Sequence, residues 1–352
     1  MAPSIASRWP DPPVDRLVTA LTPPPRFAGV RFSTYEPDPA HPAQAAALPV
    51  LSSLAARLRE PPPTGPLAAF RRRRRPETAP SVYLDGGFGV GKTHLLASLW
   101  HAAGPRETKT YVTFAGLVGL VGALSLRRAV DALRGTRLVC IDEFELDDPA
   151  NTRLVARLLS ELVADGASVA ATSNTLPGQQ GAGRFSAEHF RREISTLAGY
   201  FEVLTIDGED YRHRGAMNPP PAWNRAEVVA AAEALGDAAT LDEGRVLQGH
   251  LAALHPIRYR ALVEGLAAVF VVDATPVRDL GAALRVAYLV DVLYDLQIPV
   301  GLAGVEIAAL FPAAFLGGSY RKTLGRCVSR MGALLAEAER FRRPPERTVR
   351  AG

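Results

Sequence analysis

Between residues 81 and 207, short apolar runs alternate with longer segments in which apolar residues recur every three or four positions. Short apolar runs predict buried strands, and the longer spacing predicts helices that bury one face. The expected strands read VYLDG, KTYVTF, RLVCIDEF, SVAATSN and FEVLTID. Helices are expected from Lys92 to Gly104, from the end of KTYVTF to about Leu133, at 149–163 and at 186–198. Alternating strands and helices form a parallel sheet with covered faces. This pattern predicts an α/β core at residues 81–214.

The segments on either side of this core have different patterns. Residues 1–80 are rich in proline, as in DPPVDR, TPPPRF and EPPPTGP, and predict an arm with one helix near 43–58. GAMNPPPAWN interrupts the alternation and predicts a boundary before a carboxy-terminal α/β part at 215–352. That part reads as a strand (AVFVVDATP), a helix through Leu284 and Leu296, and a strand (IPVGLAGV).

The carboxy-terminal part loosely repeats the order of strand, acid, helix and strand in residues 137–174. Asp142 to Asn174 spans 32 positions, and Asp273 to Gly304 spans 31. The later copy lacks a phosphate loop, so no second active site is assigned to it.

Composition favours a globular protein, with 352 residues, 47% hydrophobic residues, 22% charged residues and a net charge of +4. The block at 71–75 and the tail at 321–352 concentrate basic residues, and such runs are usually solvated. Cys140 and Cys327 are too few for a disulfide framework. The start lacks the apolar stretch of a signal peptide, and AGLVGLVGALSL is too short to span a bilayer, so a cytoplasmic location and no integral membrane segment are expected.

The segment GGFGVGKT fits the phosphate-loop pattern G-x-x-x-x-G-K-[ST] between an expected strand and an expected helix. Its glycines let backbone N–H groups approach phosphate oxygens, and the following helix start favours negative charge. Lys92 would reach the β- and γ-phosphates, and the Thr93 hydroxyl would bind Mg²⁺. The pattern predicts that ATP and Mg²⁺ are bound by Gly86, Gly87, Phe88, Gly89, Val90, Gly91, Lys92, Thr93 and His94.

Two acids end the third expected strand, where ligands bind in doubly wound folds. Asp142 would hold Mg²⁺ through water, and Glu143 would orient and polarise the attacking water. Asn174 ends the next strand and can touch the γ-phosphate or that water. The extra strand KTYVTF between the loop and the acids favours ATPases with a catalytic glutamate over small GTPases. Glu145, Asp147 and Asp148 read as a solvated helix start.

The chain resembles the ZapE family of AAA+ ATPases and its mitochondrial relatives. The resemblance rests on GGFGVGKTHLL, IDEFELDDPANTRLVARLL, ATSNTLP, DGEDYRHR, VFVVDATPV, LVDVLYD and YRKTLGRCVSR, which span 81 to about 335. It implies an additional-strand P-loop fold in which Tyr35 and Gln44 approach adenine. It also implies an arginine finger from a neighbouring subunit. Ala187 lies near the usual place, so Arg184 is the first choice, with Arg191 and Arg192 as alternatives, and Arg326 is a candidate for reading the γ-phosphate.

The resemblance also implies that ATP turnover remodels a protein partner, with FtsZ at the cytoplasmic division site as the partner it suggests. Nucleotide-dependent homo-oligomers are implied because the finger acts between subunits. A nucleic-acid remodeller of the helicase-loader or replication-initiator type is an alternative. The sequence shows neither a helix-turn-helix nor an aromatic stacking platform for that function. A chaperone for membrane-protein quality control is the other alternative.

Overall fold

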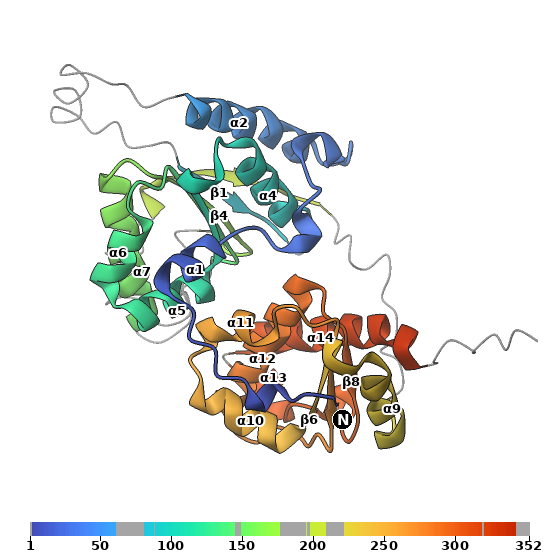
Figure 1. The fold of residues 1–352 in the computed structure, drawn as a ribbon. Coiled ribbons are helices and arrows are strands. Elements are labelled where there is room, and N and C mark those ends of the chain that lie inside the picture. Colours follow the sequence, from blue (N-terminus) through green and yellow to red (C-terminus); the bar gives the residue numbers. More distant parts are fainter. Residues whose placement is uncertain are drawn as a thin grey trace, which may run out of the picture. The chain divides into compact units, whose positions relative to one another are not determined.

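The computed structural model describes residues 2–60, 81–87, 89–144, 149–176, 195, 198–208, 222–318 and 320–342 (Figure 1). The chain divides into two compact units, one made of residues 13–216 and the other of residues 1–12 and 217–352. We call these the phosphate-loop unit and the carboxy-terminal unit. The proline-rich arm expected at residues 1–80 is therefore divided between the two units.

The sheet of the phosphate-loop unit contains five parallel strands in the order β2-β3-β4-β1-β5. All five expected strands are present, and the α/β fold class is confirmed. β4 lies between β1 and β3, so the strand that Asn174 follows separates the strand before the phosphate loop from the strand that ends in the acids. The strands are β1 (Ser81–Asp85), β2 (Lys109–Thr113), β3 (Leu138–Asp142), β4 (Ser168–Ser173) and β5 (Phe201–Thr205).

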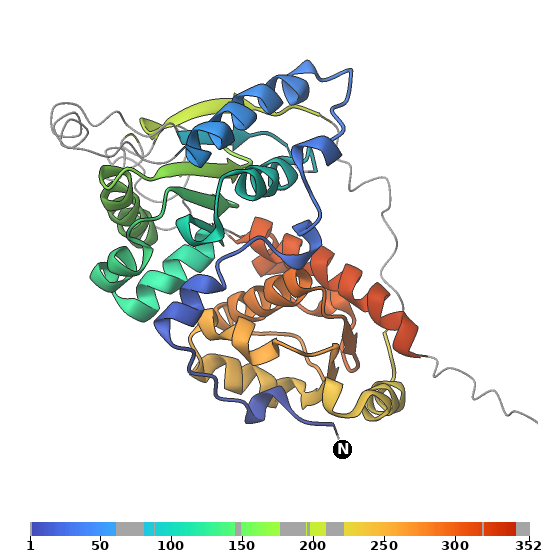
Figure 2. The same ribbon diagram turned by 45° about the horizontal axis from the view of Figure 1, so that its top comes forward.

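Helices cover both faces of this sheet, as Figures 1 and 2 show. α2 (Pro42–Arg59) and α4 (Lys92–Ala102) pack on the face that carries Val82 and Leu84. α5 (Phe114–Leu124), α6 (Leu126–Leu133) and α7 (Pro149–Ala164) lie on the other face. The single helix expected up to Leu133 is two helices, because Ser125 between them has a φ of 72°. Of the helix expected at 186–198, only residues 195 and 198 are described.

The register brings the carboxyl ends of all five strands to one edge of the sheet. Asp142 of β3 pairs with Thr113 of β2. Asp85 of β1 pairs with Ser173 of β4 and with Thr205 of β5. The phosphate loop, the two acids and Asn174 each follow one of these strand ends. Parallel pairing therefore gathers, at one edge, residues that are far apart in the sequence.

The amino-terminal residues of the phosphate-loop unit do not form the extended arm that was expected beside the 43–58 helix. They form α1 (Val14–Thr19) and two short 3₁₀ helices, η2 (Pro25–Phe27) and η3 (Phe32–Thr34), before α2. Phe27, Val30, Phe32 and Tyr35 pack against the apolar core under α2 and α4. Burial of these apolar side chains holds the segment against the sheet domain.

The carboxy-terminal unit has a parallel sheet in the order β6-β7-β8, formed by β6 (Ala239–Glu243), β7 (Ala268–Val272) and β8 (Val300–Leu302). β6 was not expected from the sequence. Asp242 of β6 is 3% exposed and accepts hydrogen bonds from the backbone N–H groups of Ile5 (3.0 Å) and Ala6 (3.1 Å). Those residues belong to η1 (Ile5–Ser7), so the first residues of the chain complete this unit.

Helices also surround this second sheet. They are α9 (Arg225–Leu235), α10 (Gly244–Ala253), α11 (Tyr259–Val263), α12 (Leu280–Leu296), α13 (Ala313–Leu316) and α14 (Arg321–Arg342). Short 3₁₀ helices across the chain are η4 (Arg106–Thr108), η7 (Gly236–Ala238), η8 (Pro256–Arg258) and η9 (Ile307–Ala309). Within the described ranges, none of the helices combines the length and apolar character that crossing a bilayer would need.

The two units share one framework at a constant distance along the chain. β2 and β6 begin 130 positions apart (239 minus 109), and so do β3 and β7 (268 minus 138). α5 and α10 each start directly after their strand, again 130 positions apart (244 minus 114). The strand orders β2-β3-β4 and β6-β7-β8 correspond as well. The loose repeat in the sequence therefore reflects a repeated strand and helix framework.

Backbone details agree with the same offset. Gly135 and Gly265 have φ values of 83° and 82°, and Glu143 and Asp273 have values of 54° and 50°. The N–H of Phe144 donates to the carbonyl of Thr172 (2.7 Å), as the N–H of Ala274 donates to that of Ala303 (3.0 Å). The equivalent of Asp273 is therefore Glu143, which corrects the pairing of Asp273 with Asp142 by one residue.

Candidate nucleotide site

The phosphate loop connects β1 to α4 at the carboxyl edge of the larger sheet. Gly86, Gly89 and Gly91 have positive φ values of 151°, 71° and 87°, which only glycine adopts readily. A Cβ on Gly91 would lie 2.6 Å from Cε2 of Tyr35, so a side chain there would also clash. α4 begins at Lys92, and its first N–H groups and partial positive charge face the loop. The loop thus combines close backbone approach with a helix start that attracts anions.

Lys92 connects the loop to β4. Its Nζ atom donates to the carbonyl oxygens of Gly86 (2.8 Å) and Gly87 and to Oδ1 of Asn174 (2.9 Å). Lys92 is 8% exposed, so the ammonium group lies under the loop rather than in bulk solvent. Two residues expected to act on the same phosphate are therefore adjacent, although 82 positions separate them.

Asp142 is a buried carboxylate that several hydroxyl groups orient. Its Oδ1 atom accepts hydrogen bonds from the hydroxyls of Thr93 (3.1 Å) and Thr172. Its Oδ2 atom accepts a hydrogen bond from the phenol of Tyr111 (3.0 Å). Both carboxylate oxygens are therefore fixed in direction, and Oδ1 lies beside the Thr93 hydroxyl.

Glu143 follows with an unusual backbone. Its φ of 54° lies in the left-handed region, which is sparsely populated by residues other than glycine. Its N–H lies within hydrogen-bonding distance of the Thr172 hydroxyl (3.0 Å) and of Oδ1 of Asp142 (3.2 Å). Such backbone strain is often found at functional sites, where surrounding contacts maintain it. Because of this backbone turn, the Glu143 side chain leaves the backbone in a different direction from that of a residue that continues the strand.

The segment before α2 and the first turn of α2 form a wall beside the phosphate loop. The Tyr35 phenol donates to the carbonyl of Val90 (3.1 Å), and the Gln44 amide donates to the carbonyl of Asp207 (2.8 Å). His94 turns toward this wall, with Nε2 3.0 Å from Oγ1 of Thr34 and its ring 5.5 Å from that of Tyr35. Gln44 is 1% exposed and so is held rigidly. Residues 34–44 thus border the loop and contact the first turn of α4 through His94.

Sequence reasoning missed three residues of this site. Tyr111 and Thr172 contact Asp142, yet each looks like an ordinary strand residue in the sequence. Asp85 ends β1 directly before the loop, and burial raises the pKa of its carboxyl, although the Gly86 N–H and the Lys92 charge oppose that shift. The alignment of neighbouring strand ends was the signal available for all three.

For other predicted residues, this geometry does not test the assigned role. Arg326 lies in the carboxy-terminal unit, where Nη2 is 3.0 Å from Oδ2 of Asp291, a carboxylate that Arg330 also contacts. Its proposed contact with the γ-phosphate stays a prediction. Several residues lie outside the described part of the chain, namely Phe88, the acids at 145, 147 and 148, the arginines at 71–75, and Arg184, Arg191 and Arg192.

The oxygen atoms beside Asp142 suit a magnesium ion. Mg²⁺ usually binds one or two protein oxygens and takes its other ligands from water and substrate phosphates. The Asp142 carboxylate and the Thr93 hydroxyl, 3.1 Å apart, provide this type of donor next to the loop. Among the described residues, no group of three or more His, Cys, Asp or Glu side chains could hold a metal without a substrate.

The equivalent position in the carboxy-terminal unit has no phosphate loop. Trp223 forms a parallel β-bridge with Ala303, and this bridge corresponds to the pairing of Leu84 with Thr172 in the phosphate-loop unit. α4 begins eight positions after Leu84 (92 minus 84), whereas α9 begins two after Trp223 (225 minus 223). Asn224 caps α9 directly, and Arg225 forms an ion pair with Asp273, the equivalent of Glu143. An arginine of the protein itself is therefore paired with this acid, at the position that corresponds to the candidate nucleotide site of the other unit.

Comparisons with known proteins agree with this geometry. The model of the family described as AFG1-like ATPase matches residues 34–237 and 224–343. The cell division protein ZapE of Escherichia coli K12 is 28% identical over 149 residues, which is 38% of this chain and 38% of that protein. Lactation elevated protein 1 homolog B of Danio rerio is 27% identical over 162 residues, or 40% of this chain and 32% of that protein. The matched part is thus well under half the length of each relative.

Among solved structures, the DnaC helicase loader is similar with a TM-score of 0.37 and 17% identity, covering 52% of this chain and 99% of that one. A similarity this distant says nothing about function. The family match, by contrast, extends from Tyr35 and Gln44 through the loop and the acids to α14. The chain belongs to the AFG1-like ATPase family.

Proposed function

We propose that the chain binds ATP with Mg²⁺ at the carboxyl edge of the five-stranded sheet and hydrolyses it. The observation that carries this proposal is the convergence of Lys92 with Asn174 and of Thr93 with Asp142 beside one glycine-rich loop. Three separate strand ends supply these groups, and a chance glycine turn would not be expected to meet all of them.

The loop and α4 provide the phosphate site. Backbone N–H groups and the helix start favour the triphosphate, and the Lys92 ammonium lies where it can transfer its contacts from loop carbonyls to phosphate oxygens. Thr93 and Asp142 would hold Mg²⁺, which offsets phosphate charge during phosphoryl transfer. Tyr111 and Thr172 keep the Asp142 carboxylate in that orientation.

Glu143 and Asn174 are proposed to act on the attacking water. The Glu143 carboxylate would accept a proton from the water as its oxygen attacks the γ-phosphorus and the bond to the leaving ADP oxygen breaks. The Asn174 amide, held by Lys92, would position the water or a γ-phosphate oxygen. The wall formed by Tyr35 and Gln44 would receive the adenine.

The finer parts of the function rest on the family resemblance. We propose that ATP promotes homo-oligomers in which Arg184 of one subunit reaches the nucleotide of its neighbour, with Arg191 and Arg192 as alternatives. Turnover would then remodel a protein partner in the cytoplasm. The relative named as a cell division protein supports a division partner, and FtsZ is our first choice.

The partner is tested by measuring steady-state ATP hydrolysis with FtsZ polymers, with single-stranded DNA, and with neither. We expect FtsZ polymers alone to raise the rate. Stimulation by DNA alone would replace this proposal with a nucleic-acid remodeller. Stimulation by a membrane-protein client but not by FtsZ would favour a quality-control chaperone.

Tyr111→Phe is expected to raise the Mg²⁺ concentration for half-maximal hydrolysis about 10-fold, because groups that orient a metal-binding carboxylate typically contribute that much. The change removes the phenol that donates to Oδ2 of Asp142 and keeps the aromatic ring. Tyr83→Phe is the matched control, since that buried phenol donates to the Thr175 carbonyl instead. An unchanged Mg²⁺ requirement in Tyr111→Phe, with normal folding, would contradict the positioning role.

A further inference from the structure

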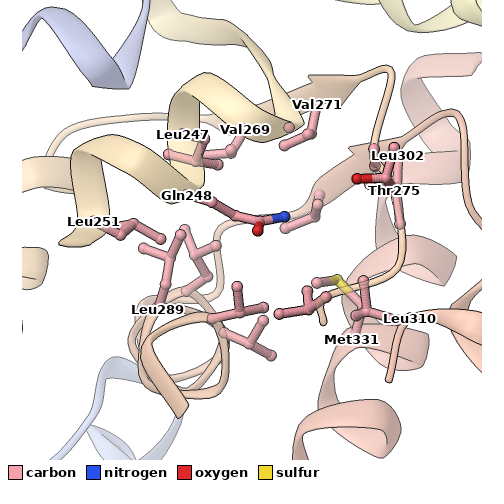
Figure 3. Close-up of a pocket in the computed structure, with 17 residues that line it drawn as sticks. Leu247, Gln248, Leu251, Val269, Val271, Thr275, Leu289, Leu302, Leu310 and Met331 are labelled. Atoms are coloured by element: carbon pink, nitrogen blue, oxygen red, sulfur yellow. The ribbon is translucent and has the colours of Figure 1, made fainter. Parts of the chain in front are cut away.

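The carboxy-terminal unit contains an apolar cavity of about 60 Å³ between its sheet and the helices α10 and α12. Aliphatic side chains line it from β7, β8, α10, α12 and α14, and Met331 of α14 closes one side (Figure 3). Among the described residues, none of the lining side chains carries a charge. The cavity lies wholly within residues 244–331 of the carboxy-terminal unit.

The repeated framework explains why this space is open. At the offset of 130, Leu247 corresponds to Leu117, Val269 to Val139, and Val271 to Ile141, so these parts of the walls are aliphatic in both units. All of these residues are buried. The framework therefore retains its apolar walls in the carboxy-terminal unit.

The residues that fill the space differ. In the phosphate-loop unit, Phe114 and Phe144 occupy it, with ring centroids 5.5 Å apart and exposures of 8% and 1%. Their equivalents in the carboxy-terminal unit are Gly244 and Ala274, and both line the cavity. The carboxy-terminal unit thus has two small residues where the phosphate-loop unit has two aromatic rings, although the walls are aliphatic in both units.

Two polar side chains point into this apolar space. Figure 3 shows the Gln248 amide reaching across the cavity and the Thr275 hydroxyl directed inward. Both residues are half-buried. Within the described part of the chain, neither side chain forms a hydrogen bond with another residue. An apolar cavity with a few convergent polar groups is the usual form of a small-molecule site.

We propose that this cavity binds a small uncharged molecule with a short aliphatic body and one hydrogen-bonding end. The aliphatic body would fill the space left by Phe114 and Phe144, and Gln248 and Thr275 would bond the polar end. A dry cavity of about 150 Å³ takes the six carbons of benzene, so a volume of 60 Å³ limits the enclosed part to about two or three heavy atoms. The lack of a charged partner in the lining excludes carboxylates and ammonium ions.

Linear alcohols from methanol to pentanol are the probes, and the Met331 methyl group is the reporter. The chain has only three methionines, so Met331→Leu assigns the ¹³C-methyl signal in the full chain. We expect a saturable shift that is strongest for ethanol or propanol, with no saturable shift for propionate or propylammonium. Linear, unsaturable shifts for every alcohol would overturn the proposal.

Variants separate the pocket from general solvent effects. Leu289→Phe and Val269→Leu narrow the cavity and should abolish saturation, and using both covers the failure of one to fold. Gly244 is not a suitable position, because a Cβ there would lie 2.8 Å from Cα of Ala274. Saturation that persists in both folded variants would place the alcohol elsewhere and overturn the proposal.

The polar end is tested by Thr275→Val and Gln248→Leu, which remove hydrogen-bonding groups but retain apolar bulk. Each should weaken propanol binding about threefold to tenfold, the usual range for one neutral hydrogen bond. Unchanged affinity in both would contradict the assigned orientation. Lys92→Ala should bind propanol as the natural chain does, which makes this result independent of the ATP site.

Discussion

Glu143→Gln is expected to leave ATP bound and to slow its hydrolysis by about 10²- to 10⁴-fold, the usual contribution of a general base. The amide has nearly the same shape as the carboxylate but cannot accept the proton of the attacking water. Backbone contacts that hold Glu143, through its N–H to Thr172 and Asp142, do not involve the altered group. Nucleotide affinity and single-turnover hydrolysis measured on the same preparation separate binding from chemistry.

Glu202→Gln is the matched control, because Glu202 is an exposed acid on β5 of the same sheet. It should hydrolyse ATP at the natural rate. If Glu143→Gln also retains the natural rate, another group takes the proton and the assignment of Glu143 is wrong. If both binding and hydrolysis are lost with a lowered unfolding temperature, Glu143→Asp provides a second substitution with the acid retained but displaced.

Lys92→Ala is expected to weaken ATP binding at least about 100-fold, because several charge-assisted hydrogen bonds to phosphate are lost together. The natural chain should bind one ATP per chain, and the variant none at the same concentration. The carboxy-terminal unit is not expected to add a second nucleotide, since the Arg225–Asp273 ion pair stands where its framework would place one. Equilibrium titration with a fluorescent ATP analogue measures both affinity and stoichiometry.

Arg128→Ala serves as the control, because this exposed arginine on α6 removes one positive charge from the same unit. It should bind ATP with unchanged affinity. Normal binding by Lys92→Ala would refute the phosphate-loop assignment. A stoichiometry of two per chain that falls to one in Lys92→Ala would leave that assignment intact and show that the repeated framework has kept a nucleotide site.

Local pattern was sufficient for most of the phosphate-loop unit. The strands that end at Asp85, Asp142 and Ser173 were expected because each is a short, almost wholly apolar run before polar residues. The glycines, Lys92 and Thr93 were expected because one spacing of residue types meets the needs of phosphate binding. These features depend on residues within about ten positions of one another, so they can be recognised in the sequence without knowledge of the fold.

β6 was missed for the opposite reason. The strand contains Asp242 near its end, and a sequence pattern predicts that this acid is solvent-exposed, yet the residue is 3% exposed. The carboxylate can be buried because N–H groups at residues 5 and 6 bond it from more than 230 positions away. The same limit applies to Tyr111, whose role depends on the pairing of β2 with β3.

The α/β class, the phosphate loop and the two candidate acids could be predicted without a structure, because they follow from local periodicity and from residue types at fixed spacing. The fold was needed to show which strand ends meet, that Lys92 contacts Asn174, and that Tyr111 contacts Asp142. It was also needed to show that Asp273 corresponds to Glu143 and is paired with Arg225. Those relations depend on strand order and on backbone turns with positive φ, which arise from contacts between residues far apart in the chain.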